Sequence, residues 1–154
     1  MLSSTEYAND PSVEVSWALE AAERARIHMS LLLTCNTEEL RLHENEDAIY
    51  EKFREVFPEM KIEKVTDVEL KGKNNKFWFE FCEHFKDDVA DYNLATIMRI
   101  RVNGAYSECN TIIVPKIIFL AIEIARNREC LNEKYKESFK MEHERITREG
   151  GNIC

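Results

Sequence analysis

Apolar residues recur at helical spacing near the start of the chain. If each residue advances by about 100°, one broad face collects Val13, Trp17, Ala18, Ala21, Ala25, Met29 and Leu32. Asp10 can cap this helix, and Pro11 suits its first turn, where no backbone N–H partner is needed. We therefore predict a helix from Pro11 to about Leu33.

Three longer segments and one short segment show the same helical period. They span Thr37 to Leu42, Glu46 to Phe57, Asn75 to Tyr92 and about Pro115 to Phe139. The second of these ends just before Pro58, at a point where a helix cannot easily continue. The third carries aromatic residues on one face and acidic residues on the other, which is typical of a helix packed on a core.

Two runs rich in β-branched residues predict extended chain. LATIMRIRV begins at Leu94 and TIIVP at Thr111, and the turn signal Asn103-Gly104 lies between them. Because the rest of the pattern is helical and no internal repeat is visible, we predict a mainly α fold, a single helical domain with a small β-hairpin. It spans residues 1–154, with an ordered core at about 7–139 and a polar tail at 140–154 that frays.

The charge balance bears on the class of partner. The chain has 29 acidic and 21 basic residues, for a formal net charge of -8. A protein of this charge is poorly suited to gripping phosphate backbones, so we expect no direct nucleic-acid binding. The longest apolar run, IIVPKIIFLAIEIA, is interrupted by Pro115, Lys116 and Glu123, so we expect no membrane-spanning segment.

No motif for a cofactor or a metal is visible. The patterns GxxxxGK(S/T), GxGxxG, GxSxG and HExxH do not occur. The five cysteines are scattered and form no CxxC pair, which favours reduced thiols in a cytoplasmic protein over disulfides or a zinc site. We therefore expect no cofactor and no metal.

Each candidate catalytic group has a simpler structural interpretation. Glu80 and Glu83 fall on the polar face of their helix, whereas acid/base catalysis needs a carboxyl with a raised pKa. His28 lies on the apolar side of the first helix, as a packed, hydrogen-bonded histidine does. Cys82 and His84 diverge on a helix. We expect no catalytic residue and no enzymatic activity.

The segment FLAIEIARNREC, from Phe119 to Cys130, combines an apolar half with a charged half. One face of a helix would hold Phe119, Glu123, Arg126 and Asn127. Two interpretations stay open for the polar residues of this face. They form an exposed patch that binds a partner, or Glu123 and Arg126 form an ordinary i,i+3 pair that contributes little, which is the commoner outcome.

Two further predictions concern single side chains. Arg128 projects from the end of an apolar face and Glu14 lies on the apolar side of its own helix, so we predict a Glu14–Arg128 ion pair. Phe77 and Phe79 lie outside the apolar stripe of their helix. Aromatic residues in such places either anchor a partner or are covered by neighbouring chain, and the second is the commoner outcome.

Three long segments carry a resemblance to known proteins. They are YANDPSVEVSWALEAAERA from Tyr7, FWFEFCEHFKDDVADYNLATIMR from Phe77 and NTIIVPKIIFLAIEIARNRE from Asn110. Together they resemble the polysaccharide-biosynthesis-domain-containing family of small eukaryotic cytosolic proteins. The resemblance extends from Tyr7 to about Glu129, and the patterns NDP…E..WA and AIEIARNRE are its most specific parts.

The resemblance implies a mostly helical single domain that acts as a dedicated chaperone near the ribosome. Its expected partner is nascent translation elongation factor 1-alpha, whose GTP-binding domain it would protect until that domain folds. The ribosome is a further expected partner, and the cytoplasm is the expected location, with the nucleus left open as a second one. Because a chaperone must show apolar surface to its client, the candidate partner-binding residues are Phe77, Phe79 and Phe119, with polar neighbours Glu123, Arg126 and Asn127.

Two other functions stay open. An enzyme of polysaccharide biosynthesis, such as a transferase, would need a deep pocket in which polar side chains with shifted pKa values converge. A general ribosome- or transcription-associated adaptor would share the chaperone's binding surface but would not prefer one client.

Overall fold

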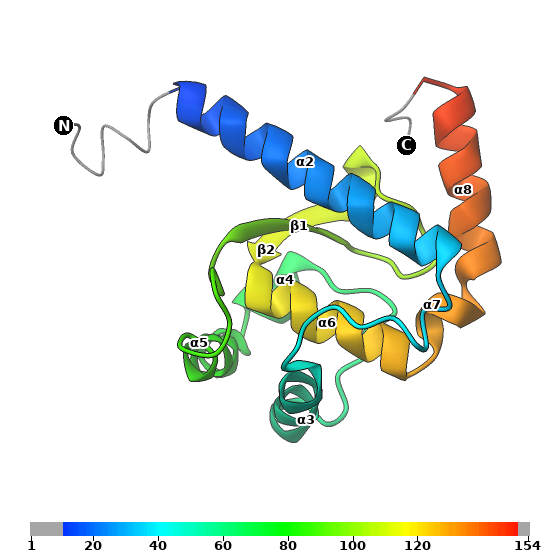
Figure 1. Cartoon of the computed structure of the whole chain (residues 1–154). Helices are drawn as coiled ribbons and strands as arrows, with labels where there is room; N and C mark the ends of the chain where they lie inside the picture. The colour runs from blue at the N-terminus through cyan, green and yellow to red at the C-terminus, as the bar shows by residue number, and fades with distance from the viewer. Residues whose placement is uncertain (1–10, 151–154) are drawn as a thin grey trace.

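The computed structural model of the protein describes residues 11–150. Helix α6 (Lys116–Arg128) lies at its centre. Every residue of this helix from Leu120 to Asn127 is buried. Strands β1 (Ala95–Arg99) and β2 (Thr111–Pro115) pack against it, and β2 leads directly into its first turn (Figure 1). The central helix is therefore buried along most of its length.

Seven other elements surround this centre. They are α2 (Pro11–Thr34), α3 (Glu46–Val56), α4 (Asp67–Lys71), α5 (Asn75–His84), the 3-10 helix η1 (Glu108–Asn110), α7 (Leu131–Lys134) and α8 (Lys136–Arg148). In Figure 1, α2 crosses over the strands on one side, and α3 and α5 lie on the other side of α6. The predicted fold class is confirmed: a single, mainly helical domain with a small two-stranded antiparallel sheet.

The predicted hairpin has a defined register. The two strands pair antiparallel, with Ile97 opposite Ile113 and Arg99 opposite Thr111. Their connection contains the predicted Asn103-Gly104 turn and then η1. Arg99, the last residue of β1, is completely buried and pairs with Glu123 of α6, which places a charged side chain in the interior.

Buried apolar residues form two clusters. The larger one joins α3, α5, both strands and α6, and its aromatic part stacks Phe57 on Trp78 with ring centroids 4.3 Å apart. The smaller one joins the C-terminal half of α2 to α8 through Met29, Leu32 and Phe139. The first and the last of the described helices thus belong to the same domain.

The structure corrects the predicted helix over Asn75 to Tyr92, because α5 ends at His84. The following residues form turns closed by bonds such as Phe85 N–H to Cys82 O, and Asp91 adopts a positive φ of 56°. These turns still bury Phe85 and Val89, so the spacing of apolar residues imitates a longer helix.

The predicted last helix and the frayed tail are also wrong. Cys130 has a left-handed φ of 65°, which stops α6 and separates it from α7 and α8. Residues up to Arg148 are helical, and Ile146 packs with Phe139 against α2 instead of fraying. Phe139 and Ile146 are the apolar residues that attach α8 to the core. The rest of its sequence is mostly polar, and for that reason the sequence predicted a solvated tail.

Three smaller points concern the other helix ends. The short helix predicted over Thr37 to Leu42 is a set of turns. Helix α4 was not predicted, although Thr66 and Glu69 form the capping box that the sequence T-x-x-E signals. The predicted cap Asp10 and residues 151–154 lie outside the described residues, and α2 begins at Pro11 as expected.

The packing of α8 can be tested by truncating its anchor. Phe139 is completely buried, so Phe139→Ala should lower the free energy of unfolding by about 3 kcal/mol or more. Met141, on the same helix, is 61% exposed, so Met141→Ala should change it by less than about 0.5 kcal/mol. Urea unfolding measures both, and equal small effects would show that α8 is not part of the folded domain.

Candidate functional site

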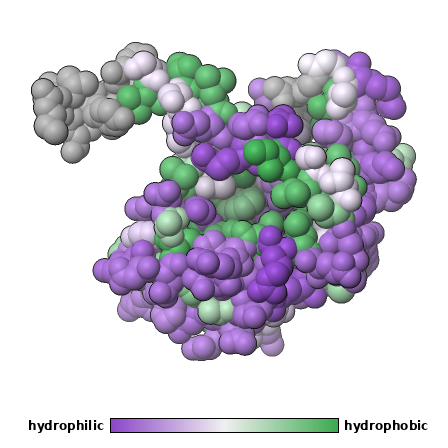
Figure 2. Space-filling view, viewed as in Figure 1, coloured by the Kyte–Doolittle hydropathy of each residue, from purple (hydrophilic) through white to green (hydrophobic). Residues whose placement is uncertain are grey.

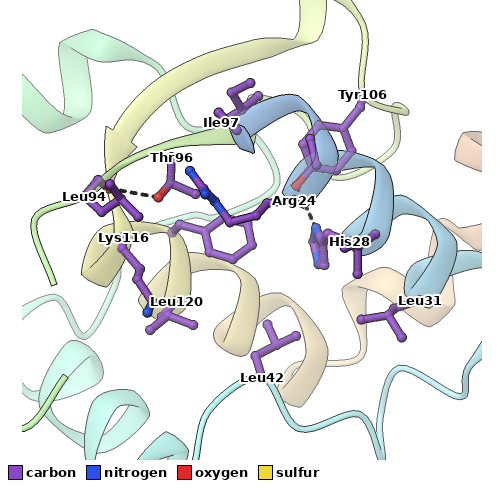
Figure 3. A pocket seen from close by; sticks show the side chains of 14 residues that line it. Arg24, His28, Leu31, Leu42, Leu94, Thr96, Ile97, Tyr106, Lys116 and Leu120 are labelled. Carbon is purple, nitrogen blue, oxygen red and sulfur yellow. Dashed lines mark hydrogen bonds between the residues drawn. The ribbon is translucent and has the colours of Figure 1, made fainter. Parts of the chain in front are cut away.

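A pocket opens between α2 and α6, with β1 at its end (Figure 3). Its volume is about 220 Å³, and most of its lining is apolar. Figure 2 shows the same place as a recess with apolar residues below α2, bordered by polar surface. It is the feature of this face into which a partner's side chain can insert.

The pocket exists because small residues of α2 face larger residues of α6. Ala21 and Ala25 lie one turn apart on α2, opposite Phe119 and Leu120. Alanines on a helix face can let another helix approach closely. The backbones of α2 and α6 stay apart instead, and the space above the alanine side chains is the pocket.

Two cationic residues line this mostly apolar pocket, and none of its described lining residues is acidic. Arg24 reaches into it from α2, and its Nε and Nη2 atoms are buried without a hydrogen-bond partner among the described residues. Lys116 lines the opposite side, and its Nζ donates a hydrogen bond of 3.0 Å to Ala90 O. The pocket is therefore locally basic in an acidic protein.

His28 and Tyr106 close the inner end of the pocket. The Tyr106 hydroxyl and His28 Nδ1 are hydrogen bonded at 2.7 Å, and the His28 ring meets the Phe119 ring edge-on at 5.2 Å (Figure 3). The expectation of a packed, hydrogen-bonded His28 is confirmed. Burial lowers the pKa of His28 to about 4, so the ring is neutral at pH 7. Burial also raises the pKa of Tyr106.

A buried ionic network lies beside the pocket in the interior. The Glu123 carboxylate accepts hydrogen bonds from Arg99 Nη2 at 3.0 Å and from Arg126 Nη1 at 3.2 Å. Arg99 also donates to Asn132 Oδ1, and Asn132 Nδ2 donates to Asn127 Oδ1, both at 2.7 Å. All five side chains are buried, so the network fastens α6 to β1 and α7.

Both guanidinium groups also donate hydrogen bonds to backbone carbonyls. Arg126 donates to Ile62 O at 2.8 Å, to Arg99 O at 3.0 Å and to Ile100 O at 2.9 Å. Arg99 donates to the carbonyls of Val102 and Gly104. Burial alone would raise the pKa of Glu123, but Arg99 and Arg126 outweigh it and hold that pKa well below its usual range.

The prediction that Glu123, Arg126 and Asn127 form an exposed patch is therefore wrong. The alternative, an i,i+3 pair of Glu123 with Arg126, is confirmed, but the pair lies in the interior and is not the ordinary weak pair that was expected. A helix covered on all sides buries its polar face as well as its apolar face. The sequence signal for this was Arg99, a lone cation among the apolar residues of a strand.

The aromatic candidates lie in two separate places. Phe119 is half-buried and lines the pocket. Phe77 and Phe79 of α5 are 51% and 66% exposed, so the expectation that neighbouring chain covers them is wrong. Phe79 lines a different pocket, next to β2. The predicted partner-binding residues thus do not form one surface.

The predicted Glu14–Arg128 ion pair is also wrong. Arg128 pairs with Glu46 at 3.3 Å and with Asp47, both at the start of α3. The side chain of Arg128 is 29% exposed, so the expected semi-buried ion pair exists with other partners. Glu14 lies in the exposed first turns of α2.

The interior network predicts a large effect of one substitution. Glu123→Gln would leave two buried guanidinium groups without a counter-charge, so it should lower the free energy of unfolding by about 3–5 kcal/mol. Glu129→Gln removes a partly exposed partner of Arg54 and should cost less than about 1 kcal/mol. Urea unfolding measures the free energy of unfolding of both variants. A decrease below about 1 kcal/mol for Glu123→Gln would contradict a stabilising role of the network.

The buried His28 predicts a pH dependence of stability. Its pKa is about 4 in the folded chain and near 6.5 when exposed, a difference equivalent to about 3 kcal/mol. The unfolded chain binds this proton first, so stability should fall between pH 6.5 and pH 4. From pH 7 to 4.5, the wild type should lose about 2–3 kcal/mol more unfolding free energy than His28→Gln. Equal losses in urea titrations would contradict a buried, neutral His28.

Two further searches cover the part of the chain that the structure describes. None of the helices within residues 11–150 is long and apolar enough to cross a bilayer. Within the same residues, no three His, Cys, Asp or Glu side chains are grouped so that they could hold a metal ion.

Comparisons with known proteins place this chain among relatives from several eukaryotes. It is 38% identical to the mouse "Protein PBDC1" over 135 residues, which cover 87% of this chain and 68% of the mouse protein. It is 39% identical to the human "Protein PBDC1" over 128 residues, which cover 82% of this chain and 55% of the human protein. The chain thus spans little more than half of the human relative.

Shorter relatives and a solved structure agree with this. A Schizosaccharomyces pombe "Protein PBDC1 homolog" is 38% identical over 134 residues, 84% of this chain and 91% of that protein. A solution NMR structure of a Saccharomyces cerevisiae protein, 36% identical, superposes with a TM-score of 0.72 and covers 80% of this chain and 88% of that one. The family model described as "PBDC1 protein" matches residues 13–137. The chain belongs to the PBDC1 family, the polysaccharide-biosynthesis-domain-containing family that its motifs resemble.

Proposed function

We propose that this protein is a non-enzymatic binding protein, a dedicated co-translational chaperone for the GTP-binding domain of translation elongation factor 1-alpha. The observation that carries the proposal is the solvent-open apolar pocket between α2 and α6. The choice of client rests on what the family resemblance of the sequence motifs implies. We propose that it acts in the cytoplasm, close to the ribosome.

The pocket supports binding of an incompletely folded client. A chaperone must offer apolar surface to segments that the client later buries, and such surface is rare on a monomeric protein. Ile27, at the rim of the pocket, is 45% exposed, and Leu31 and Leu42 stand beside it. A client side chain that enters between these residues leaves water without requiring any element of this protein to unfold.

The polar groups of the pocket support binding more than proton transfer. With a pKa of about 4, His28 is a poor proton acceptor at pH 7, and burial keeps Tyr106 protonated. The remaining polar residues are cations and Thr96, whose hydroxyl donates to Leu94 O at 2.9 Å. A transferase would be expected to combine an acid or base of suitable pKa with a deep substrate pocket.

A capture experiment tests the proposal. Newly made elongation factor 1-alpha in a translating extract should bind the wild type and Val68→Glu, which changes a 78% exposed residue of α4. Ile27→Glu replaces an apolar side chain at the pocket rim with a carboxylate, so it should reduce capture by about tenfold or more. Phe79→Glu tests the second exposed aromatic surface, and matched melting temperatures ensure that all variants are folded.

Each other outcome has a distinct meaning. If the wild type captures no elongation factor 1-alpha, the proposed client is wrong. If it captures unrelated nascent chains equally well, the protein is a general adaptor. If Phe79→Glu loses capture and Ile27→Glu keeps it, the client binds α5 and not the pocket.

A further inference from the structure

The guanidinium group of Arg24 is the strongest unexplained feature of the pocket. Its Nε and Nη2 atoms are buried, and no described residue accepts a hydrogen bond from them. A buried charged donor without an acceptor is costly, so such groups normally find a partner. In the free protein this one has none within residues 11–150.

The chain offers Arg24 an ordinary partner that it does not use. Glu20 lies four residues earlier on α2, at the spacing that usually favours an ion pair on a helix surface. No ion pair of the described residues joins the two side chains, whereas Glu23 and Arg26 on the neighbouring face do pair. Arg24 instead lines the pocket (Figure 3).

The surroundings of Arg24 specify an anion with an apolar neighbour. The second charge on the wall is the ammonium group of Lys116, and no described lining residue is acidic. The rest of the wall is mostly aliphatic or aromatic, and the volume of about 220 Å³ suits one large side chain rather than a folded element. For comparison, a cavity of about 150 Å³ holds a benzene molecule.

We propose that the pocket binds a client segment in which an acidic residue directly follows a large apolar residue. The apolar side chain enters between Ala25 and Phe119, and the carboxylate accepts hydrogen bonds from Arg24 Nε and Nη2. A carboxylate fits these two donors side by side, which makes the pairing directional as well as charged. The inference rests on the proposed function only in taking a polypeptide as the ligand.

Short neutral-ended peptides test this chemistry directly. The probes are acetylated and amidated Ser-Gly-Phe-Asp-Gly-Ser and its Asn counterpart, titrated into isotope-labelled full-length protein and followed by amide NMR shifts. The Asp peptide should shift residues 21–31 and 116–120 and should bind about tenfold more tightly than the Asn peptide. Neither peptide contains a sequence chosen from an elongation factor, so the result is independent of the capture experiment.

Two variants of α2 test whether Arg24 causes the preference for the Asp peptide over the Asn peptide. Arg24→Gln should bind both peptides with equal, weak affinity. Arg26→Gln removes a cation that pairs with Glu23 at the surface, and it should keep the tenfold preference. The proposal is overturned if neither peptide shifts the pocket residues at its highest soluble concentration, or if Arg24→Gln keeps the preference. Tighter binding of acetyl-Ser-Gly-Phe with a free C-terminal carboxylate would also overturn it, because the pocket would then recognise a chain end.

The stability of the free protein gives a second readout. Arg24→Met removes a buried cation that has no described partner, so it should raise Tm by about 2–4 °C while it abolishes the preference for Asp. A residue with a purely structural role would show the opposite sign. A lower Tm for Arg24→Met would mean that Arg24 is paired within the protein, and the proposal would fail.

Discussion

The Glu123 carboxylate, held between the guanidinium groups of Arg99 and Arg126, is the interaction on which the rest of the structure depends. Taken alone, each of these charges would be too costly to bury. Together with Asn132 and the backbone carbonyls, they form a set in which the charges have partners. This set joins the central helix to β1, to the chain around Ile62 and to α7. It makes the position of α6 specific in a way that apolar packing alone would not.

The pocket follows from how α2 is attached to this centre. Near its start, Trp17 Nε1 donates to Ala95 O at 3.3 Å, and near its end Met29 and Leu32 pack with Phe139 of α8. Between these attachments, His28 is the inner contact, through Tyr106 and Phe119. The alanine turns in the middle of α2 remain separated from α6, so a gap lined by apolar residues stays open to solvent.

The sequence predicted the elements that alternate simply between a core face and a water face. The helix from Pro11, the helix from Glu46 and the hairpin strands were all found close to their expected places. The sequence-based prediction failed for α6, which is buried on all sides. Placing Glu123 and Arg126 in solvent assumed that one face of this helix is exposed. The prediction also failed at Cys130, since a left-handed residue other than glycine leaves no mark in a helical pattern.

The candidate site was less predictable than the fold for a related reason. Phe119 was singled out, but its partners in the pocket come from α2 and β1, and only the fold brings them together. Arg24 carries no sequence signal, because an arginine four residues after Glu20 predicts a surface ion pair. Arg24 stands out because its buried Nε and Nη2 atoms have no hydrogen-bond partner among the described residues, and this is visible only in the three-dimensional structure.

We propose that the client binds the face between α2 and α6. Hydrogen–deuterium exchange across the chain, with and without the newly made GTP-binding domain of elongation factor 1-alpha, tests this most directly. The account predicts slower exchange in the middle of α2, over residues 21–31, and unchanged exchange in α5. Protection confined to α5, around Phe77 and Phe79, would contradict it, as would a bound client that protects neither helix.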